Sequence, residues 1–113
     1  MSPITTHVLN TARGGPAEGV SITLEIQESD KSWRELSRGV TNSDGRIAER
    51  LHPGDLQAAT YRITFDTAAY FERLDTPSFY PDVAVTFIIR EPGEHYHVPL
   101  LISPFGFSTY RGS

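Results

Sequence analysis

Alternation between apolar and polar residues runs through most of this sequence, in short segments that each end at a turn signal. Residues 20–27, Val-Ser-Ile-Thr-Leu-Glu-Ile-Gln, illustrate the pattern. Successive side chains of a strand point to opposite faces, so such a segment is typical of a half-buried β-strand. Similar segments, separated by turn residues, lie at 4–10, 20–27, 33–41, 46–51, 60–66 and 83–90 and within 95–113. Their spacing predicts an all-β sandwich of seven or eight strands.

Two local signals refine this prediction. The sequence Asn42-Ser-Asp-Gly45 is a strong hairpin signal, because Asp-Gly supplies the positive-φ residues that tight turns need. We therefore expect residues 33–41 and 46–51 to form a hairpin, with Arg46 as the first residue after its turn. One short helix is expected at residues 68–74, because Asp66 or Thr67 can cap its start and Pro77 follows its end.

Composition excludes several classes of function. At 113 residues, the chain is expected to form one domain, residues 1–113, with a single core. A net charge of −4 gives no electrostatic footprint for nucleic acid, and the absence of cysteine excludes disulfides and thiolate nucleophiles. No apolar run is long enough to span a membrane, and no export signal is recognisable, so a cytoplasmic location is expected. Nucleotide-binding and serine-hydrolase motifs are also missing from the sequence.

The four histidines are the first candidates for chemistry, because their unperturbed pKa lies nearest to neutrality. His52 lies in a Pro-Gly loop and is expected to be solvated. His95 and His97 share one face of a predicted strand, whereas the other face, with Tyr96, Val98, Leu100 and Ile102, is expected to form core. The His97 face must then meet water or another subunit. From these residues alone, zinc binding with His7 as a third ligand and a role at the rim of a sheet both stay open.

The last nineteen residues, His95 to Ser113, are predicted to form a hairpin that is tied to the domain. An apolar Pro-Leu-Leu-Ile run followed by two phenylalanines is unusual for a frayed end. We interpret this segment as a buried hairpin that carries chemistry. A sheet-edge hairpin with a loose polar end is the alternative.

Four segments together resemble the 5-hydroxyisourate hydrolases of the transthyretin-related family. They are Ile4-Thr-Thr-His-Val-Leu-Asn-Thr-Ala-Arg-Gly-Gly-Pro-Ala17, Thr41-Asn-Ser-Asp-Gly-Arg46, Phe79-Tyr-Pro-Asp82 and the terminal His95-Tyr-His-Val-Pro-Leu-Leu with Tyr110-Arg-Gly-Ser113. The resemblance spans essentially the whole chain. It implies a two-sheet transthyretin-like sandwich with one short helix, assembled as a homotetramer, a dimer of dimers, with active sites at the dimer–dimer interface.

The resemblance also implies a reaction and its residues. The family hydrolyses 5-hydroxyisourate to 2-oxo-4-hydroxy-4-carboxy-5-ureidoimidazoline in urate degradation, and it uses no metal or cofactor. The hypothesis carried over is that His7 and His97 activate a water for attack on the ring N1–C6 amide, that Arg46 holds the substrate carbonyl oxygens and that Ser113 positions water or substrate. The matched site residues are His7, Arg46, His97 and Ser113 for catalysis, with Arg46, Tyr110, Arg111 and Ser113 for substrate binding.

Two readings from other classes are kept as alternatives. One is a transthyretin-type carrier of a small hydrophobic ligand, which the side chains of His97 and Tyr110 disfavour because they should narrow the channel. The other is a periplasmic or adhesive sandwich module, for which a monomer is expected in gel filtration.

Overall fold

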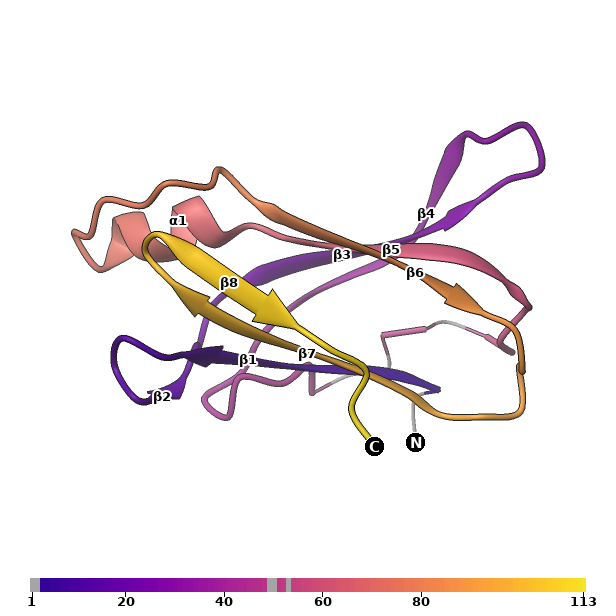
Figure 1. The fold of residues 1–113 in the computed structure, drawn as a ribbon, viewed down its shortest axis with the longest axis horizontal. Coiled ribbons are helices and arrows are strands. Elements are labelled where there is room, and N and C mark those ends of the chain that lie inside the picture. Colours follow the sequence, from indigo (N-terminus) through magenta and orange to yellow (C-terminus); the bar gives the residue numbers. More distant parts are fainter. Residues whose placement is uncertain (1–2, 49–50, 53) are drawn as a thin grey trace.

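The computed structural model describes residues 3–48, 51–52 and 54–113. Within them, two four-stranded sheets pack face to face (Figure 1). Sheet A has the strand order β2-β1-β7-β8 and sheet B the order β4-β3-β5-β6. The elements are β1 (Ile4–Asn10), β2 (Gly15–Pro16), β3 (Ser21–Gln27), β4 (Trp33–Val40), β5 (Ala59–Phe65), α1 (Thr67–Arg73), β6 (Val83–Ile89), β7 (Tyr96–Ser103) and β8 (Gly106–Thr109). The predicted two-sheet all-β sandwich with one short helix is confirmed.

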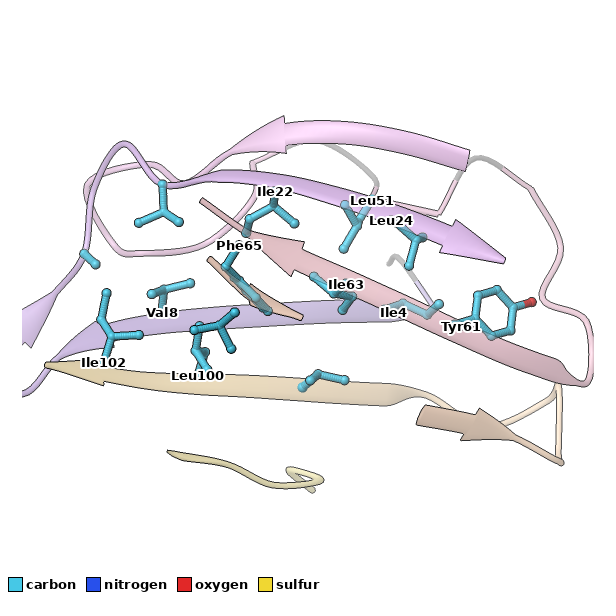
Figure 2. Packing of buried hydrophobic residues seen from close by; sticks show 14 of the residues in the cluster. Ile4, Val8, Ile22, Leu24, Leu51, Tyr61, Ile63, Phe65, Leu100 and Ile102 are labelled. Atoms are coloured by element: carbon cyan, nitrogen blue, oxygen red, sulfur yellow. The ribbon is translucent and has the colours of Figure 1, made fainter. Parts of the chain in front are cut away.

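The core lies between the sheets and is built by the alternation seen in the sequence. Figure 2 shows Val8 of β1 and Leu100 of β7 pointing toward Phe65 and Ile63 of the opposite sheet. All four side chains are fully buried. Complete burial of a side chain of this size contributes roughly 1.5–3 kcal/mol. A one-residue shift in strand register would move these core side chains to the solvent-facing side of the sheet. The burial of one face therefore specifies the register of each strand.

The centre of sheet A is a parallel pair made from the first and seventh strands. In Figure 1, the indigo β1 and the orange β7 run side by side. Their register places Thr5 opposite His97, and His7 opposite Pro99. Because Ile4 and Tyr96 point into the core, these odd-numbered residues lie on the outer face of the sheet. The predicted division of residues 95–102 into a core face and a histidine face is thus confirmed.

The predicted return strand at residues 46–51 is wrong for residues 46–48 and 51, which the structure describes and which form no strand. The turn itself forms, since the Gly45 amide donates to the Asn42 carbonyl (2.9 Å) and Gly45 has a φ of 76°. Over these described residues the chain then forms no ladder with β4, although Ile47 lies against Gly39 and the Leu51 carbonyl accepts from the Ser37 hydroxyl; Arg46 instead forms an isolated antiparallel bridge with His7. β2 pairs only with Leu9 and Asn10, at the end of β1, so the remaining edge of β1 is accessible to Arg46. Glu49 and Arg50, in the second half of the predicted strand, lie outside the described residues.

The helix α1 follows the predicted cap. An Asp66 side-chain oxygen accepts from the Ala69 amide at 3.3 Å, which satisfies one of the free N–H groups of the first turn. Tyr70 and Phe71 anchor the helix in the core. Within the described residues, no helix is long and apolar enough to cross a membrane.

Candidate active site

Two histidines meet on the outer face of sheet A because their strands are neighbours. His7 lies in the middle of β1, and His97 is the second residue of β7, two positions away in the parallel register. Both side chains are half-buried. The strands of a sheet run about 4.8 Å apart, so side chains at such positions can act on one small molecule.

Arg46 reaches this face through a backbone approach that only glycine permits. The Val8 amide donates to the Gly45 carbonyl (2.8 Å), and Arg46 pairs with His7 in the bridge. A Cβ at Gly45 would overlap the Val8 carbonyl oxygen, and the positive φ is itself unfavourable for other residues. The Asp-Gly-Arg turn therefore places an arginine beside His7.

The terminal segment approaches His97 in a comparable way. The Gly112 amide donates to the His97 carbonyl at 2.8 Å, forming a second isolated antiparallel bridge. A Cβ at Gly112 would lie 2.6 Å from Cδ2 of His97. Ser113 follows directly and is exposed. The predicted hairpin forms, and it brings the backbone of Gly112 beside His97. It is not buried as we interpreted it, because β8 is the edge strand of sheet A and Phe105, Phe107 and Tyr110 are exposed.

Charge and burial at His97 favour its neutral form. Burial lowers the pKa of His97 below its usual 6.5, and the positive charges of Arg46, His7 and His95 lower it further. A hydrogen bond to the backbone of Thr5 acts in the opposite direction. A neutral imidazole at physiological pH is able to accept a proton, which is what a general base requires.

Thr5 also belongs to this face, although no sequence motif singled it out. Its Oγ1 lies 2.8 Å from Nδ1 of His97 and 3.1 Å from Nε2 of His95. The contact depends on the pairing of β1 with β7, which brings together residues 92 positions apart. Local sequence patterns carry no signal for that pairing.

Tyr110 and Arg111 lie elsewhere in this chain. Both line a cavity of about 240 Å³ at the edge of the sandwich, together with Phe87 of β6 and Val98 on the core side of β7. The guanidinium carbon of Arg111 lies 4.4 Å from the ring centroid of Tyr96, and its Nη2 pairs with Glu94 at 2.9 Å. Their contact with substrate stays a prediction.

His52 differs from its predicted solvated state. It is buried, with only 5% of its surface exposed, and its ring centroid lies 6.0 Å from that of Tyr61. Its Nδ1 lies 2.7 Å from the Gly54 carbonyl oxygen. The loop folds back over the end of the core, which the Pro-Gly composition did not reveal. His52 therefore has a structural role at the end of the core and does not belong to the outer face of sheet A.

The donor groups are not arranged for a metal. In the described part of the chain, no group of three or more His, Asp or Glu side chains is placed to hold an ion. Thr5 lies between His95 and His97, and Arg46 adds a positive charge beside His7. The cluster is instead suited to acid–base chemistry on a substrate with carbonyl oxygens.

Comparisons with known proteins show the family of this chain. The chain is 45% identical to mouse (Mus musculus) 5-hydroxyisourate hydrolase over 113 residues, covering 99% of this chain and 96% of the mouse protein. The structure of Klebsiella pneumoniae 5-hydroxyisourate hydrolase matches with a TM-score of 0.85 and 39% identity, covering 100% and 94% of the two chains. Sea bream transthyretin in complex with thyroxine matches with a TM-score of 0.92 and 30% identity, covering 97% and 94%. Residues 4–112 match the profile of the HIUase/Transthyretin family, to which this chain therefore belongs.

Proposed function

We propose that this chain hydrolyses 5-hydroxyisourate in urate degradation, opening the ring between N1 and C6 to give 2-oxo-4-hydroxy-4-carboxy-5-ureidoimidazoline. The observation that carries the proposal is the convergence of His7, Arg46 and His97 on one face of sheet A. The names of the mouse and Klebsiella relatives support the substrate.

In the proposed mechanism, His7 and His97 bind a water molecule between them. His97, whose pKa is lowered, takes a proton from that water as its oxygen attacks C6. The C6–N1 bond then breaks, and His97 returns the proton that it took from water to N1 as this nitrogen leaves. Positioned acid–base groups of this kind contribute about 10²–10⁴-fold to a rate.

Arg46 has the complementary role of binding negative charge. Its guanidinium presents a planar set of donors that suits the carbonyl oxygens of the substrate. Charge develops on the C6 oxygen during attack, so an arginine held beside His7 stabilises the transition state more than the ground state. We assign Ser113 to positioning of water or substrate, because a serine nucleophile at the chain end would need its own base and oxyanion hole.

We further propose a homotetramer, a dimer of dimers, with the sites at the dimer–dimer interface. The outer face of sheet A carries half-buried Leu9 and Leu101 beside the histidines. Apposition of two such faces would cover these leucines and close a channel over His97. Light scattering coupled to gel filtration tests this: a monomer at micromolar concentration refutes the assembly.

A carrier function is the second candidate, favoured by the match to sea bream transthyretin bound to thyroxine. The two functions predict different results with the same protein. Thyroxine binding at micromolar strength, without acceleration of hydroxyisourate decay, would establish the carrier. Fast hydrolysis with no thyroxine binding would exclude it.

The direct test generates hydroxyisourate in place from urate with urate oxidase and follows its absorbance. The protein is expected to accelerate the decay, and His97→Asn or Arg46→Ala to remove most of the acceleration. Arg38→Ala is the matched control, because Arg38 is exposed on β4 of the opposite sheet and pairs with Glu35. No acceleration by the wild-type protein refutes the function. Full activity of both site variants refutes the role assignments.

A further inference from the structure

The hydroxyl group of Thr5 connects two imidazole rings on the outer face of sheet A. Its oxygen lies 2.8 Å from Nδ1 of His97 and 3.1 Å from Nε2 of His95. The parallel register sets this arrangement, since Thr5 is directly opposite His97 and His95 immediately precedes β7. Of the three side chains, His97 and Thr5 are half-buried and His95 is exposed.

A hydroxyl donates one proton and accepts through two lone pairs, so the contacts allow two directions along the chain and a third arrangement, in which both imidazoles donate to Thr5 and its own proton points elsewhere. In the first direction, Nδ1–H of His97 donates to Thr5, and the Thr5 hydroxyl donates to Nε2 of His95. In the second, His95 donates to Thr5, and Thr5 donates to Nδ1 of His97. A neutral imidazole carries one proton, so the second direction would put that proton on Nε2 of His97.

The first direction leaves a base in the site, as does the third arrangement, in which Nδ1–H of His97 also donates to Thr5; the second direction does not. With Nδ1 protonated and turned to Thr5, the free lone pair of His97 is on Nε2, the ring nitrogen that Thr5 does not engage. In the second direction, Nε2 carries a proton and cannot take one from water. A base whose second nitrogen is held by another group is the arrangement found in catalytic histidines generally.

We propose that Thr5 is a positioning residue, which fixes His97 as the Nδ1–H tautomer with Nε2 free to act as base, and that His95 supports it by accepting the Thr5 hydroxyl proton. This inference rests on the proposed function, in which His97 takes the proton of water. It assigns roles to two residues that lie outside the set His7, Arg46, His97 and Ser113.

The expected effects differ between the two supporting residues. Thr5 is half-buried against His97, so Thr5→Val removes the acceptor of Nδ1–H in a site where water has limited access. Loss of such a supporting hydrogen bond typically costs about 10–100-fold in activity. His95 is exposed, and water can replace it as an acceptor, so His95→Ala should have the same direction of effect but a smaller size.

The first measurement is independent of activity. Nitrogen-15 chemical shifts of the His97 ring, recorded on the free wild-type protein at pH 7, report which nitrogen is protonated. We expect the Nδ1–H tautomer in wild type and in Thr5→Ser, and a shift toward Nε2–H in Thr5→Val. An Nε2–H tautomer in the wild-type protein overturns the proposal without any variant.

The second measurement is steady-state hydrolysis of hydroxyisourate. Thr5→Val is expected to lower kcat about 10–100-fold with little change in KM, and Thr5→Ser to restore most of the rate. Thr64→Val is the matched control, because Thr64 is a half-buried threonine of β5 on the outer face of the opposite sheet. If wild type is active and Thr5→Val keeps both its kcat and the Nδ1–H tautomer, the inference fails and the proposed function stands. If wild type is inactive, the proposed function fails, whatever the tautomer.

Discussion

The substitution Gly112→Ala tests how the terminal segment and His97 fit together. An added Cβ would lie 2.6 Å from Cδ2 and 3.3 Å from Cγ of the His97 ring. Carbon atoms in contact prefer about 3.5–4.0 Å, so either the ring or the terminal segment must move by roughly 1 Å. Gly112 is not among the positive-φ residues, so alanine is compatible with its backbone.

A displacement of that size should impair catalysis far more than folding. A misplacement of about 1 Å at a catalytic group can cost on the order of 10²-fold in rate, equivalent to about 2.7 kcal/mol in the activation free energy. Gly112 pairs with β7 through a single bridge close to the chain end, so the melting temperature should change by no more than a few degrees. We therefore expect about a 10²-fold lower kcat/KM in a protein of nearly unchanged stability.

The hydroxyisourate decay assay and a thermal melt measure the two quantities on the same preparation. Gly93→Ala is the control, because a Cβ at Gly93 meets no atom within 4 Å. Should Gly112→Ala match wild type and Gly93→Ala in kcat/KM, the packing of residue 112 against the catalytic imidazole would be refuted. A large loss of stability with an unchanged rate would contradict the same reasoning from the other side.

Three further results are expected. Gly45→Ala should lower the free energy of unfolding by about 1–3 kcal/mol in a denaturant melt, because the added Cβ would overlap the Val8 carbonyl oxygen. It should also reduce activity, because the overlap would move Arg46 away from His7. A free energy of unfolding equal to that of wild type would contradict this prediction. Arg46→Ala should raise the pKa of His97 toward 6.5 in an NMR titration, because it removes a positive charge that lowers this pKa. In wild type, kcat/KM should decline on the acid side only below pH 6.5, because a base with a lowered pKa is protonated at lower pH. A decline that begins above pH 6.5 would argue against His97 as the base. Removal of residues 111–113, or a C-terminal tag, should reduce activity much more than the melting temperature, and a fully active truncated protein would show that the site does not use its own chain end.

The sequence predicted the elements better than their partners. Alternation is a local property, so it identified β3 and the two faces of β7 correctly, and the cap at Asp66 located α1. Turn chemistry predicted the bend at Gly45 but not where the chain goes next, because the edge of β1 that receives Arg46 is a tertiary feature. The predicted hairpin partner was therefore wrong although its turn was right.

The site shows the same division between local and tertiary information. His7, Arg46 and His97 could be selected through the resemblance to known enzymes, and their register in sheet A explains their convergence. Thr5 could not be selected, because its contacts exist only once two strands from opposite ends of the chain are paired. Burial of His52 was missed for a related reason: its loop packs on the core instead of extending into water.

The pairing of β1 with β7 also sets the order in which the protein becomes active. Residues that face each other across these strands are about 92 positions apart, so no earlier part of the chain can substitute for the pairing. Closing a loop of that length has an entropic cost that grows with (3/2)RT ln n, and folds dominated by such contacts typically form in milliseconds to seconds. Sheet B can assemble from residues 21–89 while the chain is still being synthesised, but His97 meets Thr5 only after β7 has emerged. A chain that lacks β7 therefore has the strands of sheet B but neither a complete sheet A nor the paired site residues.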